Sequence, residues 1–279
     1  MAACFSKNRG IGGNEWAEIG FVCFQNHYLC TVILNSCYAM STAILIFLSA
    51  LAGSFVQRVC GFGFGIFIMT ILPYLMPSYP EATALSGFLS LLQSGIVLVS
   101  VYKYLNIKNL YVIFLSFCVF SFFAIKFVSV SDDGILHIIL GCVLICLAVY
   151  FLFFSKRAAV SPTWKWQVSL GGLSGIMGGL FGMHGPAAVV YFLSSEKTKE
   201  GYLAVAQAYF VITNIYMSLF RAGYGFVTPS VGMGLLCALP GIVIGIILGR
   251  KVFDRINQLT LKRIIYFYMI IAGVIQLVG

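Results

Sequence analysis

Long apolar runs dominate this chain, and short polar or charged segments separate them. The runs cover residues 19–57, 62–76, 84–102, 110–130, 135–154, 168–193, 202–220, 228–249 and 263–278. Most are about as long as the 20 or so helical residues that cross the hydrocarbon core of a bilayer. Strict alternation of apolar and polar positions is absent, which disfavours a membrane β-barrel. The pattern predicts an all-α, polytopic membrane protein.

The composition agrees with this interpretation. Of the 279 residues, 61% are hydrophobic and 9% are charged, whereas a soluble domain carries about a quarter charged residues. The net charge of +9 comes from bases clustered in short loops, which is the positive-inside pattern. The sequence outside the apolar runs contains no basic stripe with interleaved aromatic residues, the pattern that would indicate nucleic-acid binding. We expect a lipid bilayer as the surroundings, no nucleic-acid partner and no soluble catalytic domain, and the oligomeric state stays open.

Two halves of the chain show the same order of features, offset by about 121 residues. Each opens with a glycine-interrupted apolar segment, at 61–65 and at 178–186. Each continues with a run that carries a mid-span amide, Gln93 in the first half and Asn214 in the second. We predict two homologous halves of about four membrane segments each, the first segment of each being Gly-broken or re-entrant. The predicted units are an N-terminal extension 1–40, a first transmembrane repeat 41–155, a basic connecting loop 156–167 and a second repeat 168–279.

The loop charges bear on topology. The loops 103–108 and 156–165 are basic, whereas Asp132 and Asp133 mark the opposite side. The most basic loop is 250–263. It lies on the same side of the membrane as the other basic loops only if the broken segment of the second half, 168–193, does not cross the membrane but returns to the side from which it started. The halves are then inverted repeats. A parallel arrangement of full spans stays open, because it violates the charge rule at one loop only.

The acidic residues indicate which ion the protein handles. All eight lie in the N-terminal region or in loops, and none lies in the middle of a predicted span. A cation carrier normally carries an intramembrane carboxylate, because a dehydrated cation needs negative partners. An anion needs hydrogen-bond donors and positive potential instead. The sequence therefore predicts a small anionic substrate.

Arg58 and His184 lie at matching places beside the two breaks. Arg58 interrupts an apolar stretch, so it either faces a polar cavity or extends to the headgroups. His184 either binds an anion or exchanges a proton near neutral pH, or it is a hydrogen-bonded packing residue. Each break also frees backbone N–H groups at the start of the next helix. The predicted substrate-binding residues are Arg58, Gly61, Gly63, Gly65, Gln93, Gly182, His184, Gly185 and Asn214.

Other patterns have simpler interpretations. Cys23, Cys30 and Cys37 share one helical face, but no CxxC pair or zinc spacing occurs, so we expect no metal site and no cofactor. Ser174 lies in a segment that resembles the serine loop of rhomboid proteases, yet no histidine has the matching context, and we expect packing rather than catalysis. We expect no cleavable signal peptide.

Glycines spaced by four form two ladders, at 171–179 and at 241–249. Small residues at this spacing let membrane helices approach each other closely. We therefore predict that the second ladder, which no polar residue accompanies, serves helix packing; the first overlaps the broken segment and can serve both purposes.

At the two breaks the sequence resembles the sulfite exporter TauE/SafE family, whose two homologous halves each open with a glycine-rich motif followed by a proline. The first copy reads Gly61-Phe-Gly-Phe-Gly65 with Pro73, and the second runs from Gly175 to Gly185-Pro186. Two departures are a phenylalanine inside the first motif and His184 and Pro186 at glycine positions of the second. The resemblance covers roughly residues 41–279.

The resemblance implies a secondary transporter, either an exporter or a permease. Its expected substrates are sulfite, organosulfonates or related sulfur-containing anions, with coupling to the proton gradient, in the cytoplasmic membrane of a bacterium. An anion-selective channel is the leading alternative, because it can use the same donors. A membrane assembly factor without transport is a third interpretation.

Overall fold

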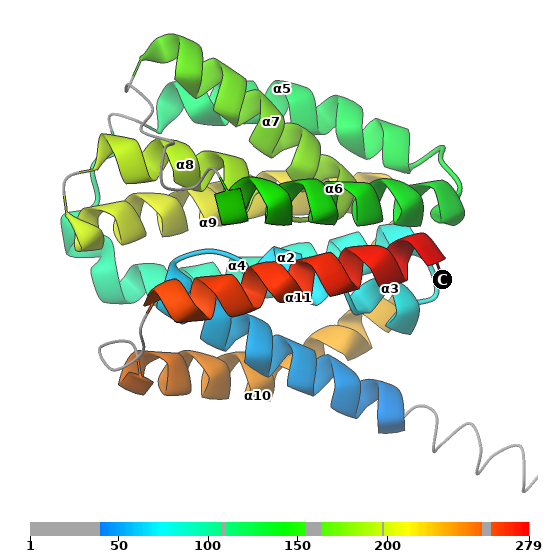
Figure 1. Cartoon of the computed structure of the whole chain (residues 1–279). Coiled ribbons are helices and arrows are strands. Elements are labelled where there is room, and N and C mark those ends of the chain that lie inside the picture. The colour runs from blue at the N-terminus through cyan, green and yellow to red at the C-terminus, as the bar shows by residue number, and fades with distance from the viewer. Residues whose placement is uncertain (1–39, 108–109, 154–162, 197, 253–257, 279) are drawn as a thin grey trace, which may run out of the picture. The chain divides into compact units, whose positions relative to one another are not determined.

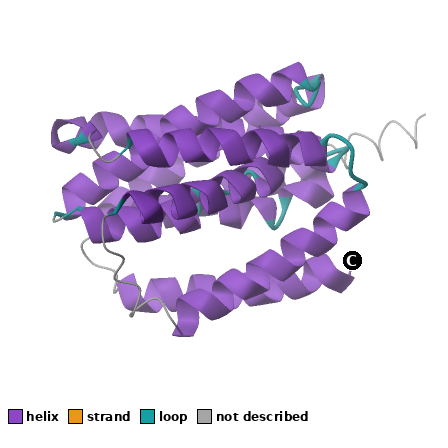
Figure 2. Ribbon diagram, turned by 90° about the horizontal axis from the view of Figure 1, so that it is seen from above, coloured by secondary structure: helices purple, strands orange, loops and turns teal. Residues whose placement is uncertain are grey.

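The computed structural model describes residues 40–107, 110–153, 163–196, 198–252 and 258–278. The chain divides into residues 1–44 and residues 45–279, and the second unit contains the candidate site and the helices that surround it. The extension 1–40, with Cys23, Cys30 and Cys37, lies outside the described residues except for Met40. Within the described ranges every regular element is a helix (Figure 2).

The helix Met40–Cys60 precedes the helices labelled in Figure 1. In chain order these are α2 (Phe64–Met69), α3 (Leu72–Leu75), α4 (Tyr79–Val101), α5 (Tyr111–Val128), α6 (Asp133–Phe153), α7 (Trp164–Phe181), α8 (Gly185–Ser195), α9 (Lys199–Gly223), α10 (Pro229–Val252) and α11 (Gln258–Val278); the short 3-10 helix η1 (Tyr102–Tyr104), which the figure does not label, follows α4. Among the described residues, six helices are long and apolar enough to cross a membrane, judged by length and composition. The predicted all-α, polytopic membrane architecture is confirmed.

The two central helices begin with the same kind of signal. The hydroxyl of Ser78 accepts a hydrogen bond from the Glu81 N–H (3.4 Å) at the start of α4. At the start of α9 the hydroxyl of Thr198 accepts one from the Gly201 N–H (3.1 Å). A short hydroxyl side chain at this position satisfies a backbone donor that the helix itself leaves without a partner. Local sequence therefore sets where both helices begin.

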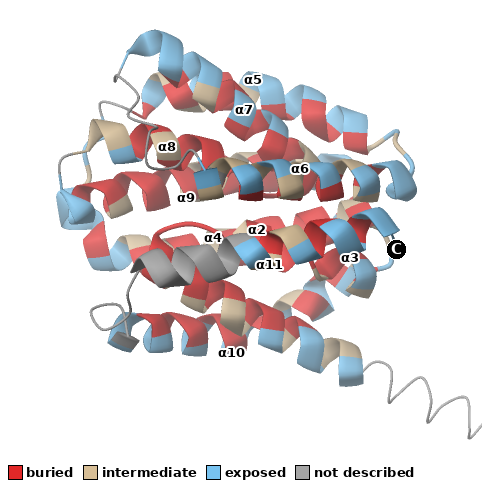
Figure 3. Cartoon of the chain, viewed as in Figure 1, coloured by how far each residue is buried: buried red, intermediate tan, exposed pale blue. Residues whose placement is uncertain are grey.

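Large apolar side chains cover the outward faces of the helices. Val99 is 73% exposed, Leu219 69% and Met233 65%, and Figure 3 shows exposed residues along the outer faces of α5 and α6. In a chain of this composition such faces suit contact with lipid tails rather than water. The inward faces carry the buried core, including Phe64 and Phe117.

Helices α4 and α9 pack against each other and run antiparallel. A Cβ added to Gly87 of α4 would lie 2.9 Å from Nη1 of Arg221, near the end of α9. One added to Gly201, at the start of α9, would lie 4.0 Å from the carbonyl oxygen of Tyr104, just after α4. The start of each helix therefore lies beside the end of the other.

Helices α6 and α11 form a second antiparallel pair. Nδ1 of His137 lies 2.6 Å from Oε1 of Gln276, and a Cβ added to Gly141 would lie 2.8 Å from the carbonyl oxygen of Gly273. The two helices lie side by side in front of the other helices in Figure 1.

The two glycine ladders join helices that run parallel. Cβ atoms added to Gly171 and Gly175 of α7 would lie 2.5 and 2.6 Å from carbonyl oxygens of α5, at Ile113 and Phe117. Such distances leave no room for a side chain, so the backbones pack directly on each other. The ladder on α7 therefore serves helix packing as well.

The ladder on α10 contacts the helix Met40–Cys60 in the same way. Cβ atoms added to Gly241 and Gly245 would each lie 2.4 Å from a carbonyl oxygen, at Phe47 and Leu51. The packing role predicted for this ladder is confirmed.

These directions show that the chain doubles back between the helix Met40–Cys60 and α4. Helix α10 also runs parallel to α4, since Thr228 donates to Glu81 (2.8 Å) where both helices begin and Gly234 packs on Leu85 four residues further into α4. Two successive helices that both run parallel to α10 need a returning segment between them. Residues 61–78, with α2 and α3, are that segment.

The second half doubles back in the same way between α7 and α9. Aromatic pairs join α5 to α9 in parallel register, Phe114 with Tyr216 and Phe122 with Phe220. Because α7 also runs parallel to α5, helix α8 (Gly185–Ser195) lies between two helices of the same direction and returns the chain between them.

Candidate substrate-binding site

Two breaks in the helices lie at the heart of the site. The helix Met40–Cys60 ends before Gly61, and Gly61 and Gly63 have φ values of +83° and +109°. Helix α7 ends at Gly182, with φ +65°. This left-handed region is strained for residues with a Cβ and open to glycine. Helices α2 and α8 then start within three residues of each break, so each break ends one helix and begins another.

The two breaks touch each other directly. A Cβ added to Gly65 would lie 2.8 Å from the carbonyl oxygen of Gly182 and 3.1 Å from Cα of Met183. Real Cβ atoms essentially never approach other atoms to less than 3.0 Å. Glycine at position 65 is therefore what lets the first turn of α2 rest on the second break.

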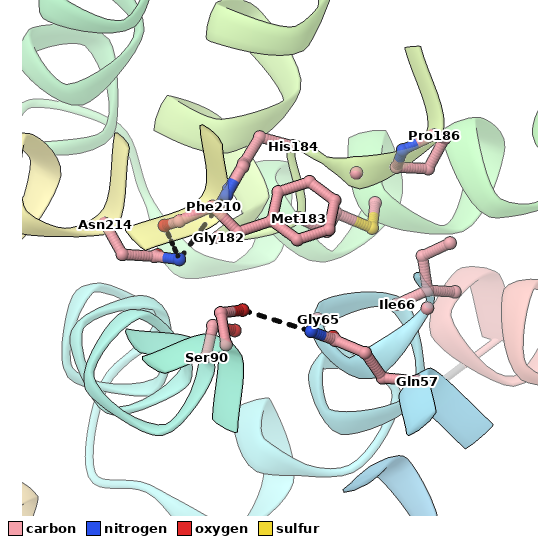
Figure 4. Close-up of a pocket in the computed structure, with 13 residues that line it drawn as sticks. Gln57, Gly65, Ile66, Ser90, Gly182, Met183, His184, Pro186, Phe210 and Asn214 are labelled. Atoms are coloured by element: carbon pink, nitrogen blue, oxygen red, sulfur yellow. Dashed lines mark hydrogen bonds between the residues drawn. The ribbon is translucent and has the colours of Figure 1, made fainter. Parts of the chain in front are cut away.

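A small cavity lies where the breaks meet (Figure 4). Its volume is about 20 Å³, and about 10–15 Å³ is enough for one water molecule. It is lined by residues of both breaks and of the helices beside them: Gln57, Gly63, Gly65, Ile66, Ser90, Ser94, Gly182, Met183, His184, Gly185, Pro186, Phe210 and Asn214.

A chain of buried amides holds the first break in place. Gln57 Nε2 donates to Ser94 Oγ and to Gln207 Oε1, both at 3.1 Å. Gln207 Nε2 in turn donates to the carbonyl oxygen of Gly61 (3.0 Å). Buried polar groups that find partners in this way fix the relative position of the segments that carry them. The network thus connects the first break to α4 and α9.

Asn214 holds the His184 ring on the other side of the cavity (Figure 4). Asn214 Nδ2 donates to the carbonyl oxygen of Phe210 (2.8 Å), which fixes the orientation of its amide. The same Nδ2 lies 3.4 Å from His184 Nε2, so in the neutral tautomer that accepts this bond the ring proton is on Nδ1. His184 Nδ1 and Asn214 Oδ1 are buried and have no partner. The cavity wall therefore offers a free N–H donor.

The carbonyl groups of the two break glycines are bonded in matching ways. Gln207 of α9 donates to the carbonyl oxygen of Gly61 (3.0 Å), and Ser86 of α4 donates to that of Gly182 (3.5 Å). Positions 86 and 207 are 121 residues apart, as are positions 61 and 182. Each break is thus held by a side chain that comes from the other half of the chain.

The electrostatics of the cavity favour an anion. None of its lining residues is an aspartate, glutamate, lysine or arginine. Helix α8 begins at the cavity with Gly185, and the first N–H groups of a helix have no partner inside it and carry partial positive charge. A buried cation, Arg221, lies seven residues after Asn214 on α9, about 10 Å along the helix axis.

The family model described as "Sulfite exporter TauE/SafE" matches residues 45–275. The chain belongs to this family. A relative from Cupriavidus necator (strain H16), named "Probable sulfite/organosulfonate exporter TauE", is 25% identical over 233 residues, which cover 80% of this chain and 88% of the relative. No solved structure matches the chain. Family members are exporters, so the chain is a multi-pass membrane transporter and not an enzyme.

The structure brings six of the nine predicted site residues of this TauE/SafE family member to the cavity wall. They are Gly63, Gly65, Gly182, His184, Gly185 and Asn214. Gly61 does not line the cavity, and its carbonyl oxygen accepts a hydrogen bond from Gln207 Nε2 (3.0 Å). Gln93 is buried but does not line the cavity; its Nε2 donates to the carbonyl oxygen of Ser54 (3.5 Å) and its Oε1 has no partner.

Arg58 does not line the cavity. Its Cβ and Cγ pack against Gly249 of α10, at 2.8 and 3.0 Å from where a Cβ of that glycine would lie. Successive residues of a helix point about 100° apart. For this reason Gln57 faces the cavity and Arg58 faces α10.

Sequence reasoning missed several lining residues of the cavity. Gln57 was detectable as an amide at the end of an apolar run, and Ser90 and Ser94 as hydroxyls spaced by four on one helical face. The hydroxyl of Ser174 donates to the carbonyl oxygen of His184 (2.6 Å) rather than to its ring. That contact supports the structural role expected for this serine.

Proposed function

We propose that this protein is a secondary transporter of small sulfur-containing anions, namely sulfite and organosulfonates, and that the cavity between the two breaks is its substrate site. The observation that carries the proposal is a cavity built from two broken segments, with free donors and a helix start in its wall and no carboxylate. The name of the Cupriavidus relative supports this substrate class.

The proposed site recognises an oxyanion through donors rather than through a paired cation. Sulfite and sulfonates present three oxygen atoms that only accept hydrogen bonds. His184 Nδ1 and the amides at the start of α8 can donate to them, and Asn214 holds the ring in place. We propose that Gly61 and Gln93 hold the first break and α4 in place, and that Arg58, which lies outside the cavity beside Gly249, attracts anions toward it.

We further propose that residues 41–155 and 168–279 are inverted repeats. The matched bonds of Gln207 to Gly61 and of Ser86 to Gly182, at a common offset of 121, support this relation. Reciprocal contacts of this kind are what a two-fold axis produces. Because α4 and α9 are antiparallel, such an axis lies across the helices and hence in the plane of the membrane, as in other inverted-repeat transporters.

On this proposal each broken segment is re-entrant, and only three helices of each half cross the membrane from one face to the other. The end of α4, the start of α7 and the end of α10 then share one face, which collects Lys103, Lys165, Arg250 and Lys251. The positive-inside rule makes this face cytoplasmic. Asp132 and Asp133 lie at the other face. Membership of the exporter family supports the cytoplasmic membrane as the location of the protein.

Transport by alternating access follows from this arrangement. The cavity holds about one water molecule in the present conformation, so a sulfonate enters only when the halves move apart. Rocking of one half against the other about the α4–α9 contact opens the cavity to one face at a time. His184 is the titratable group in the cavity wall and is our candidate for coupling to the proton gradient.

Counterflow in proteoliposomes tests this function. Vesicles that contain the purified protein and unlabelled sulfite should accumulate radiolabelled sulfite above equilibrium for a short time, and methanesulfonate inside should support the same uptake. A carrier gives this overshoot because loaded sites exchange faster than empty ones return. Uptake that never exceeds equilibrium would indicate a channel, and no uptake over protein-free vesicles would reject transport of these anions.

A further inference from the structure

Arg221 is a fully buried cation outside the cavity. Its side chain has 0% exposure near the end of α9. Nη2 donates to the carbonyl oxygens of Gly178 (2.8 Å) and Gly179 (3.4 Å), in the last turn of α7. Carbonyl groups at the end of a helix lack intrahelical partners and carry partial negative charge, so this contact accounts for one nitrogen of the guanidinium.

The other two nitrogens of Arg221 have no partner. Nε and Nη1 are buried and make no hydrogen bond, and no carboxylate of the described residues pairs with the side chain. An unpaired guanidinium inside a membrane protein is costly, and such residues usually mark a substrate or ion pathway. A structural cap on α7 needs only Nη2 and leaves the remaining donors unexplained.

Other buried polar atoms without partners lie next to these donors. Nη1 of Arg221, Oδ1 of Asn214 and Oγ of Ser218 surround the site of the missing Cβ of Gly87, at 2.9, 3.8 and 3.8 Å. The hydroxyl of Tyr79 is fully buried, has no partner and interacts electrostatically with Arg221. We call Tyr79, Ser218 and Arg221 the Arg221 cluster.

The Arg221 cluster lies between the cavity and one face of the protein. Asn214, in the cavity wall, precedes Ser218 by one turn of α9 and Arg221 by two. Tyr79 is the first residue of α4, and its backbone N–H donates to Asp133 at the start of α6 (3.0 Å). The unpartnered polar atoms therefore run from the cavity toward the face that carries the acidic residues.

The cluster is present in one half only. At the offset of 121, position 100 corresponds to Arg221 and position 97 to Ser218, and these residues are Ser100 and Val97. The hydroxyl of Ser100 donates to the carbonyl oxygen of Val97 (2.6 Å), so its bond is made within its own helix. The path from the cavity to the opposite face thus lacks an equivalent cation.

We propose that the Arg221 cluster is a second anion subsite, which takes a sulfite or sulfonate on its path between the cavity and the acidic face. Arg221 Nε and Nη1, Ser218 Oγ and Tyr79 OH are its donors, and they reach the anion when α4 and α9 separate at this end. The inference rests on the proposed transport function. The subsite places a fixed positive charge on one side of the central cavity, which itself is lined by no charged residue.

Two variants separate this role from a structural one. Tyr79→Phe and Ser218→Ala each remove one polar atom that makes no hydrogen bond in the structure. A purely structural role predicts unchanged or higher stability, because a buried unsatisfied group is lost. The subsite predicts the same stability together with methanesulfonate and sulfite binding weakened about 3- to 10-fold in calorimetric titrations of the purified full chain.

Arg221 itself is tested by Arg221→Gln and Arg221→Lys. The glutamine variant should bind both anions about 10- to 100-fold more weakly, since hydrogen bonds to a charged group are lost, and lysine should restore part of the affinity. Lys103→Gln removes an equal charge from an exposed side chain and should leave binding unchanged. Tyr191→Phe, whose hydroxyl accepts from Gln167, should lower stability without changing binding.

The outcomes distinguish the subsite from the transport function. Binding unchanged within about twofold in the Tyr79, Ser218 and Arg221 variants overturns the subsite, even if wild-type counterflow is normal. Wild-type protein that binds methanesulfonate through Arg221 but gives no counterflow refutes transport and retains the subsite. If the Arg221 variants do not fold, the Tyr79→Phe and Ser218→Ala titrations decide alone.

Discussion

Replacing Gly65 by alanine tests whether direct contact between the two breaks is required for transport. The residue is the second of α2 and has an ordinary helical φ, so alanine adds no backbone strain there. The added Cβ would lie 2.8 Å from the carbonyl oxygen of Gly182 and 3.1 Å from Cα of Met183. Both are backbone atoms, which cannot move aside as the end of a flexible side chain can.

The magnitude can be worked from these distances. Ordinary contact begins at 3.4 Å, so α2 and the second break must separate by about 0.6 Å to accommodate the methyl group. Overpacking of this kind costs about 1–3 kcal/mol, and the better helix propensity of alanine returns up to about 1 kcal/mol. We expect a net loss of about 1–2 kcal/mol in stability. We also expect at least a tenfold lower sulfite flux, because binding groups need placement within about 0.5 Å.

Gly95→Ala is the matched control. This glycine lies inside α4, and an added Cβ there meets nothing within 4 Å. The change should raise stability by up to about 1 kcal/mol and leave flux unchanged. Thermal unfolding in detergent and sulfite counterflow in proteoliposomes, each compared with the wild type, measure the two effects. If Gly65→Ala matches Gly95→Ala in both assays, the contact between the breaks is not part of the transport site.

Three further changes probe the cavity and its supports. Gln207→Leu should lower stability in thermal unfolding by about 2 kcal/mol or more, because the Gly61 carbonyl and the Gln57 amide each lose a buried partner. Ser86→Ala removes a 3.5 Å bond to the other break and should lower stability by less than about 1 kcal/mol. Equal losses of stability in the two variants would contradict the geometry. His184→Gln keeps an amide donor but no titratable group, so sulfite counterflow should persist while its response to an imposed pH gradient disappears. A pH response that survives in this variant would exclude His184 as the coupling residue.

The asymmetry of charge along the proposed path bears on the direction of transport. The central cavity carries donors and no fixed charge, so the proposed substrate would be held there by dipoles and released without breaking a salt bridge. Arg221 adds a full charge on the side of Asp132 and Asp133 only. A transporter with one charged subsite need not bind its substrate equally well from both faces. Anion titrations and counterflow from each side of the membrane measure this difference.

Much of the architecture was predictable from local sequence. Apolar runs of about 20 residues specify membrane helices wherever they occur, because the bilayer core is a solvent without hydrogen-bond partners. The glycines at 61 and 182 were visible in the sequence, and both adopt positive φ values that suit glycine. Six of the nine predicted site residues line the cavity, because most of them belong to these breaks.

The tertiary structure alone decided which polar side chains share a site. Gln57 and Arg58 are neighbours in sequence, and only the positions of α4 and α10 determine that the amide faces the cavity and the guanidinium does not. The burial of Arg221 was equally hidden, since its environment comes from α7 and from Tyr79 of α4. Propensity and hydropathy act within a few residues of the chain, whereas burial and hydrogen-bond partners depend on helices that are distant in sequence. The sequence by itself therefore determined a helical membrane protein, and packing decided which donors face the cavity.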